Sequence, residues 1–107
     1  MPNLRGLDPV AAARLVIAVG AYWALHGCGP SWREAARAAG WTWTETRPHP
    51  QASLRSDDLA DRMHTLRRAG LVTFTREPHS LDLTPTGRRW ALATLRRERA
   101  IRKRELA

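Results

Sequence analysis

The side chains best able to bind a metal ion or to act as nucleophiles are four histidines and one cysteine: His26, Cys28, His49, His64 and His79. Their spacings match no standard metal site, and the sequence has no paired cysteines. It also lacks a glycine-rich loop of the kind that cradles phosphates. Cys28 lies between glycines, as expected of a small packed residue or a turn thiol. We therefore expect no catalytic site, no cofactor and no metal.

The basic residues suit a different chemistry, the electrostatic attraction of a polyanion. The chain carries 18 Lys and Arg against 10 Asp and Glu, a net charge of +8. Eight basic and two acidic residues follow Leu83, so this end carries +6 and residues 1–83 carry +2. The attraction is thus concentrated in one terminal helix, which favours a polyanionic partner. A solvated helix end that aids solubility is the alternative.

Length and composition limit the class of protein. A chain of 107 residues forms one domain, and 43% hydrophobic residues with five Trp favour a folded one. The single cysteine excludes a disulfide framework and fits a reducing compartment. The apolar run from Leu15 to Leu25 is too short to span a bilayer, and no secretory segment is visible. We expect a cytoplasmic protein.

Two helices are predicted in the first part of the chain. Asp8 followed by proline is typical of a helix start, and the helix over 8–26 is apolar almost all round. Such a helix is buried against other helices or at a subunit interface. Ser31 and Glu34 form a capping box, in which each satisfies a free backbone donor of the other. This box predicts a second, alanine-rich helix over 31–39.

A third helix is predicted over residues 56–69. Leu59, Met63 and Leu66 fall on one face, and Gly70 ends the helix. The opposite face is polar and carries Asp57, Asp61, His64, Thr65 and Arg68, with Arg62 at its margin.

The stretch before this helix, residues 41–55 (WTWTETRPHPQASLR), contains two prolines and cannot be one regular element. Two interpretations remain open. It is either a structured segment anchored by Trp41 and Trp43, or a mobile loop that carries Arg47 and Arg55 toward a ligand.

A hairpin and a last helix are predicted after the glycine. Residues 71–84 alternate between apolar and polar, which places Val72 and Phe74 on one side of a strand. A polar turn separates this strand from its return strand. Thr84 followed by proline then begins a basic helix over 85–105.

Three stretches of the sequence resemble a winged helix-turn-helix domain. "LRRAGLVTF" and "LDLTPTGRR" are similar to the end of a recognition helix, the wing and the start of the last helix. "GPSWREAARAAGW" resembles the second helix of such domains, including the amino-terminal domain of SOS-type repressors. The long first and last helices are closer to small MarR-like or PadR-like regulators. The resemblance covers about residues 8–95 and implies a mainly α fold with a small β-hairpin, namely a three-helix core, a two-stranded wing and a long C-terminal helix. The connection over 41–55 is longer than is usual in the family.

The resemblance also implies DNA contacts. It places the third helix in the major groove, with base readers drawn from Arg55, Ser56, Asp57, Asp61, Arg62, Thr65 and Arg68. Ser31 and Arg33 would hold a phosphate, Arg76 and His79 at the wing tip would reach the backbone or minor groove, and Arg88 would add phosphate contacts. Helix capping is the structural alternative for Asp57 and also for Ser31, where the two roles are compatible, and a polar turn is the alternative at the wing tip. The basic tail either grips DNA, adding affinity without base preference, or lies in solvent.

These features together predict a sequence-specific regulator that binds double-stranded DNA, a repressor bound to an inverted repeat as a homodimer. The dimer is expected through the first and last helices, because several apolar residues of the first helix point in different directions: Val16, Ile17, Val19, Tyr22, Trp23 and Leu25. Two other classes remain open. One is a winged-helix module for protein interaction, and the other is an RNA-binding or nucleoid-associated protein that uses mainly the basic tail.

Overall fold

The computed structural model describes residues 2–41 and 52–106, and side chains throughout these ranges except at 52–58. The described ranges form four helices and one two-stranded antiparallel sheet, in the order α1 (Pro9–His26), α2 (Trp32–Ala38), α3 (Ala52–Arg68), β1 (Val72–Thr73), β2 (Asp82–Leu83) and α4 (Pro85–Leu106). The predicted class, mainly helical with a small β-hairpin, is confirmed.

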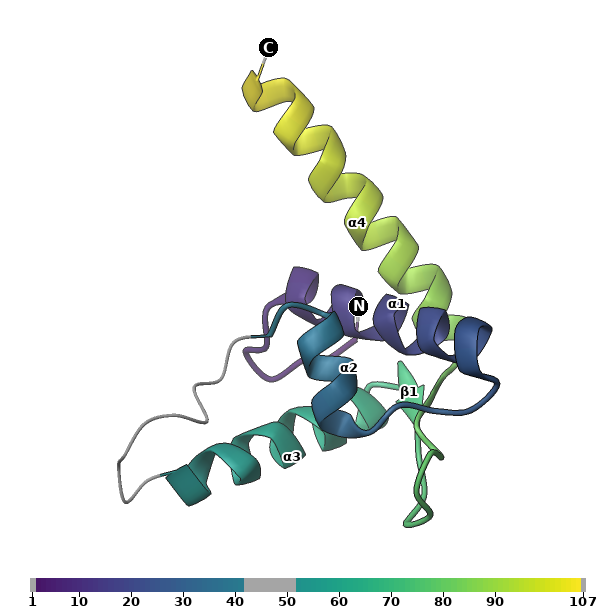
Figure 1. The fold of residues 1–107 in the computed structure, drawn as a ribbon. Coiled ribbons are helices and arrows are strands. Elements are labelled where there is room, and N and C mark those ends of the chain that lie inside the picture. Colours follow the sequence, from purple (N-terminus) through teal and green to yellow (C-terminus); the bar gives the residue numbers. More distant parts are fainter. Residues whose placement is uncertain (1, 42–51, 107) are drawn as a thin grey trace.

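Helix α1 is the centre of the fold, and it packs against α4, α2 and β2 (Figure 1). The carboxylate of Asp8 accepts the Ala11 N–H at 3.1 Å, and Gly27 ends the helix in the left-handed conformation at φ 70°. Leu15, Val16 and Val19 are fully buried. By length and composition alone α1 would also suit a membrane span. Five of its apolar residues are buried in the core, namely Ala12, Ala13, Leu15, Val16 and Val19.

Less of α1 is exposed than the sequence suggested. Val16 and Val19 are buried, and the indole N–H of Trp23 donates to the Leu81 carbonyl at 2.6 Å. Among the residues that led us to expect a dimer, only Leu25 is largely exposed to solvent, at 80%. Helix α4 covers α1 most extensively, and α2 and β2 cover it further.

Helix α2 is short, and its alanines allow a close approach to α1. Gly40, at φ 77°, turns the chain, and the Trp41 N–H donates to the Ala36 carbonyl at 2.9 Å. The Trp41 indole N–H donates to the Ala11 carbonyl of α1 at 3.0 Å. Trp41 is therefore an anchor, as one of the two interpretations required. Trp43, the other expected anchor, lies outside the described residues.

Helix α3 begins at Ala52, four residues earlier than predicted. The predicted connection over 41–55 is therefore helical in its last four residues, ASLR. These residues are compatible with a helix, and the acidic residues that suggested a later start are tolerated within the second turn. The rest of that connection, residues 42–51, lies outside the described residues.

The core face of α3 is the predicted one. Met63 and Leu66 are fully buried and Leu59 is 8% exposed, so the spacing of these residues correctly identified the inward face. Gly70, at φ 78°, ends the helix, and the Leu71 N–H donates back to the Leu66 carbonyl at 3.0 Å. This turn directs the chain into the hairpin.

The hairpin has only two paired residues in each strand. Val72 pairs with Leu83 and Thr73 with Asp82. Val72 and Phe74 are buried while Thr73 is exposed, which confirms the predicted alternation. The regular pairing is shorter than the predicted hairpin, because the tip is held by hydrogen bonds of side chains, described below, in place of strand pairing.

The start of α4 is fixed by Thr84 and Gly87. The Thr84 hydroxyl donates to the Gly70 carbonyl at 2.6 Å and accepts the Gly87 N–H at 2.8 Å, so it caps α4 as predicted. A Cβ at position 87 would overlap the backbone of Leu71. The sequence "LTPTG" is thus a cap followed by a glycine that lets the helix lie close to the backbone of Leu71, just before β1.

The second part of α4 leaves the body (Figure 1). Glu98 is the last half-buried residue, and its carboxylate lies 3.9 Å from Arg14 of α1 and 3.2 Å from Arg102. All described residues after Glu98 are exposed. We refer to residues 96–106 as the basic tail.

Candidate nucleic-acid interface

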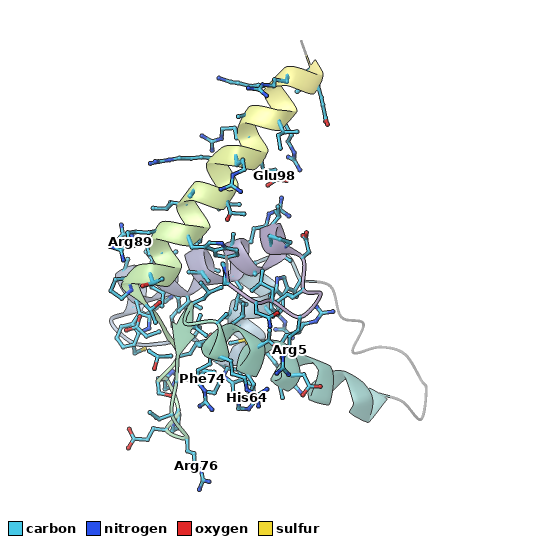
Figure 2. All side chains as sticks on the ribbon, turned by 180° about the vertical axis from the view of Figure 1, so that it is seen from behind. Arg5, His64, Phe74, Arg76, Arg89 and Glu98 are labelled. Carbon is cyan, nitrogen blue, oxygen red and sulfur yellow. The ribbon has the colours of Figure 1, made fainter. Side chains whose placement is uncertain are left out.

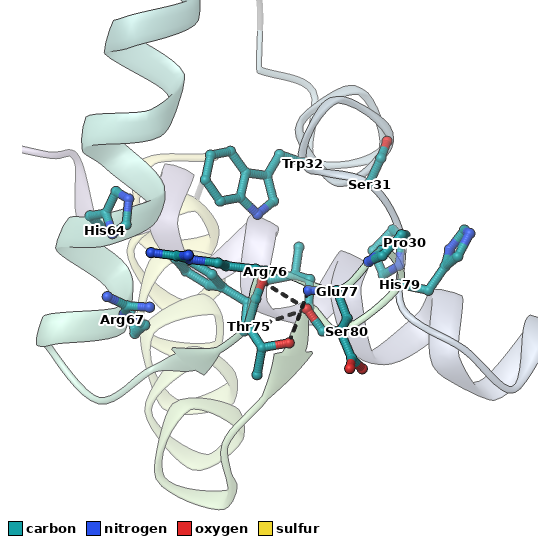
Figure 3. Close-up of a pocket in the computed structure, with 13 residues that line it drawn as sticks. Pro30, Ser31, Trp32, His64, Arg67, Thr75, Arg76, Glu77, His79 and Ser80 are labelled. Atoms are coloured by element: carbon teal, nitrogen blue, oxygen red, sulfur yellow. Dashed lines mark hydrogen bonds between the residues drawn. The ribbon is translucent and has the colours of Figure 1, made fainter.

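A groove of about 940 Å³ lies between the start of α2, one face of α3 and the hairpin (Figure 3). Its lining comes from three separate parts of the chain: Pro30, Ser31, Trp32, His64, Arg67, Phe74, Thr75, Arg76, Glu77, Pro78, His79, Ser80 and Leu81. Among its charged residues are two arginines, Arg67 and Arg76, and a single carboxylate, Glu77. The groove therefore favours an anionic partner over a cationic one.

Aromatic rings form the floor of the groove. Trp32, His64 and Phe74 contact one another edge to face, with ring centroids 5.1–5.9 Å apart. The guanidinium of Arg67 lies over the Phe74 ring, 4.6 Å from its centroid. Such contacts stabilise by about 0.5–1 kcal/mol each when exposed, and they hold the cation at a fixed place beside α3.

The hairpin tip is organised by side chains. The Ser80 hydroxyl donates to the Thr75 carbonyl at 3.1 Å and accepts the Thr75 N–H at 3.0 Å, and the Glu77 N–H donates to the Thr75 hydroxyl at 3.2 Å (Figure 3). Arg76 is exposed at this tip and extends away from the body (Figure 2). Its position is compatible with the contact to a nucleic-acid backbone predicted for it.

His79 is turned toward the body. It adopts φ 62°, and its Nδ1 lies 2.8 Å from the Gly29 carbonyl, which requires the Nδ1–H tautomer as donor. The Gly29 N–H donates in return to the His79 carbonyl at 3.1 Å. A Cβ at Gly29 would overlap the carbonyls of Leu81 and His79. His79 thus fastens the hairpin to the turn between α1 and α2, a structural task that the sequence did not predict.

Ser31 caps α2, which was the structural alternative for this residue. Its hydroxyl accepts the Glu34 N–H at 3.1 Å, while its own N–H donates to the Glu34 carboxylate at 3.1 Å. The hydrogen bond from the Ser31 backbone lowers the pKa of Glu34. Tyr22 also donates to this carboxylate, at 3.2 Å. A negative charge therefore stands where Ser31 and Arg33 were expected to hold a phosphate, and Arg33 is exposed nearby.

The exposed face of α3 presents three of the predicted readers one turn apart. Asp61 and Arg68 are exposed, and Thr65 is half-buried between them. The Thr65 hydroxyl donates to the Asp61 carbonyl at 2.8 Å, which leaves its oxygen as an acceptor. Arg62 is directed elsewhere, with its guanidinium 5.5 Å from the Trp41 ring centroid. The side chains of Arg55, Ser56 and Asp57 lie outside the described residues.

The two ends of α4 lie on different sides of the molecule. Arg88 and Arg89 are exposed in its first turns, near the base of the hairpin, whereas the basic tail lies at the end of the molecule opposite Arg76 (Figure 2). The tail therefore does not line the groove. That the tail grips DNA stays a prediction, and a contact there would lie apart from the groove.

Sequence reasoning missed three contributors to the groove: Trp32, Arg67 and Phe74. Phe74 is buried in the core and Trp32 is partly buried against it, and both also line the groove. The available signal was the spacing of His64 and Arg67, three residues apart on one helix, with an aromatic residue just past the glycine.

Comparison with protein-family models, with curated proteins and with solved structures found no match for this chain. The site must therefore be judged on its own geometry. Within the described residues no three His, Cys, Asp or Glu side chains are grouped to hold a metal ion, and His49 lies outside them. Cys28 is half-buried, with a free thiol.

Proposed function

We propose that this protein is a winged-helix regulator that binds double-stranded DNA through α3 and the hairpin. The observation that carries the proposal is the exposed face of α3, Asp61, Thr65 and Arg68, lying beside a groove that holds Arg67 and Arg76. An α-helix fits the major groove, where base edges present distinct donors and acceptors. Phosphates of the same duplex would then pass over the groove and the hairpin tip.

Each residue has a defined role in this arrangement. Arg68 donates to the acceptors of guanine, and Asp61 accepts from the amino group of cytosine. Thr65, whose hydroxyl hydrogen is engaged within the helix, accepts a hydrogen bond through its free lone pair. Arg67 and Arg76 attract the phosphates that flank the bases read, and Arg88 attracts those near the base of the hairpin.

Assembly as a homodimer is part of the same proposal. A largely apolar groove of about 440 Å³, formed by α1, α2 and Leu95 of α4, includes the exposed Leu25. A second copy that covers this surface would present two α3 helices to an inverted repeat, with half-sites about one helical turn apart. A dimer bound to such an inverted repeat would act as a cytoplasmic repressor, because it would exclude other proteins from that DNA. Light scattering checks the dimer, because a mass near that of the 12.1 kDa chain would contradict it.

The decisive experiment selects the preferred sequence from a random duplex pool and then measures binding of variants to it. Thr65→Ala with Arg68→Ala should weaken binding by about 1–3 kcal/mol for each hydrogen-bonded base that these side chains read, and should relax the preference at those positions. Arg99→Ala, which removes the same charge from the basic tail, is the matched control and should keep the preference. If the double variant binds the selected site as tightly as the unaltered protein, α3 does not read the bases.

The alternatives give other outcomes. A winged-helix module for protein interaction would select no duplex, since its affinity does not depend on phosphate charge. A protein that binds RNA or coats DNA through its basic tail would bind all duplexes equally, and removal of the tail would abolish that binding.

A further inference from the structure

Two cationic surfaces lie apart from each other among the residues that the structure describes. The first is the groove with Arg67 and Arg76. The second is the basic tail, which has six basic and two acidic residues. One of these two, Glu98, is already paired with arginines at 3.2 and 3.9 Å. Neither surface is continuous with the other, because the packed half of α4 and the body lie between them.

The two surfaces lie at opposite ends of the molecule. In both Figure 1 and Figure 2, seen from opposite sides, α4 leaves the body away from the hairpin and α3. Glu98 is the last residue tied to the body, through Arg14. The helix continues to Leu106, about 12 Å further at 1.5 Å per residue. A straight duplex seated on α3 and the hairpin therefore runs on the far side of the body from the tail.

The chemistry of the tail favours a phosphate backbone over a lipid or a hydrophobic groove. Its large apolar residues are Ile101 and Leu106, and both are exposed. They lie about 140° apart around a helix of 3.6 residues per turn, so they form no common stripe. The six cations cover about 220° of the helix circumference, and Glu98, Ile101 and Glu105 lie in the remaining arc. A helix with cations over most of its circumference can neutralise phosphates over a wide range of directions, whereas insertion of a helix into a membrane interface requires one apolar face.

We propose that the basic tail is a second nucleic-acid site, and that one protein bridges two duplexes. The first is held by α3 and the hairpin, as in the proposed function, on which this inference rests. The second is held by the tail through its phosphates, without base preference. Binding there releases counterions, so each phosphate neutralised should steepen the dependence of bridging on salt by about 0.9 in the logarithmic slope.

A capture experiment tests the bridge. A duplex of the selected sequence is fixed to beads and loaded with full-length protein, and a fluorescent duplex of unrelated sequence is then added. The test variant replaces the four cations beyond Glu98 by glutamine: Arg99→Gln, Arg102→Gln, Lys103→Gln and Arg104→Gln. Glutamine keeps the helix propensity of the tail, and circular dichroism checks that the fold is retained. We expect unchanged loading on the beads and at least about tenfold less capture of the second duplex.

A charge-conserving variant is the matched control. Arg99→Lys, Arg102→Lys and Arg104→Lys should capture the second duplex nearly as well as the unaltered protein, because a phosphate backbone needs charge more than guanidinium geometry. A parallel arm replaces the second duplex by vesicles of anionic phospholipid. Binding of the vesicles without capture of the duplex would assign the tail to a membrane surface and overturn the proposal.

The remaining outcomes are distinguishable. Equal capture by the glutamine variant means that another surface, such as the second α3 of a dimer, holds the second duplex, and the inference is wrong. Loss of loading together with capture places the tail in the first site, which also overturns it. Loading without capture by the unaltered protein refutes the bridge and leaves the proposed function standing. Absence of loading refutes both.

Discussion

The two halves of α4 belong to one continuous helix and are held by different forces. The first half lies on α1, with Gly87 and Ala91 buried and Trp90 and Leu95 packed against the core. The second half has no described residue buried beyond Glu98. Small residues allow the first half to approach the body closely, whereas charged side chains keep the second half in water. Burial therefore holds the first half in place, whereas the second half is stabilised only by solvation or by a partner.

Truncation gives the largest expected contrast between the halves. A chain that ends at Glu98 should unfold with the same free energy as the full chain, within about 0.5 kcal/mol, because it loses only exposed residues. A chain that ends at Thr84 loses α4, the most extensive cover of α1, and should not fold cooperatively, since domains are stable by only about 5–15 kcal/mol. Urea unfolding followed by circular dichroism measures both. Equal free energies of unfolding for the two truncated chains would show that the two halves of α4 do not differ in their contribution to stability.

Gly87→Ala tests the close approach at the start of α4. The added Cβ would overlap the Leu71 backbone, so the variant should lose about 1–3 kcal/mol despite its better helix propensity. Ala100→Val adds more volume in the exposed tail, and its cost should stay below about 0.7 kcal/mol. Thermal unfolding of both variants checks the difference, and a stabilised Gly87→Ala variant would show that the contact is not tight.

Thr84→Ala tests the cap. Its hydroxyl joins the start of α4 to Gly70 at 2.6 Å and to the Gly87 N–H at 2.8 Å, and removal of an N-cap costs about 0.5–2 kcal/mol. Thr86→Ala, two residues on and exposed, is the control and should change little. If both substitutions have the same cost in urea unfolding, the cap contributes nothing specific.

Arg102→Gln should have the smallest effect. It removes the ion pair with Glu98, four residues earlier on the same helix, and such exposed pairs contribute about 0.3–0.5 kcal/mol. The loss should disappear at high salt, which screens exposed charges. A double-mutant cycle with Glu98→Gln in low and high salt measures it. A coupling above about 1 kcal/mol would mean that the tail is held more firmly than its exposure suggests.

The sequence predicted features whose causes are local. The Asp8 and Thr84 caps, the capping box and the inward face of α3 each depend on residues a few positions apart, so spacing alone identified them. The turn at Gly70 was found for the same reason.

Features that depend on residues far apart in the chain were not predicted from the sequence. His64 was assigned to an open polar face, but it packs between Trp32 and Phe74, which reach it from other elements. The bond between His79 and Gly29 joins residues 50 positions apart. The direction of the tail follows from the packing of α4 on α1, which no periodicity encodes.

The hairpin has a consequence for the order of folding. Two paired residues in each strand cannot hold a hairpin in water, so this one depends on the Trp23 indole and on Gly29, both far away in sequence. Such contacts form late, because a long loop must close first. We expect Trp23→Phe, which deletes the donor to Leu81, to accelerate unfolding and to leave the refolding rate nearly unchanged. The hairpin would therefore form last during folding and open first during unfolding.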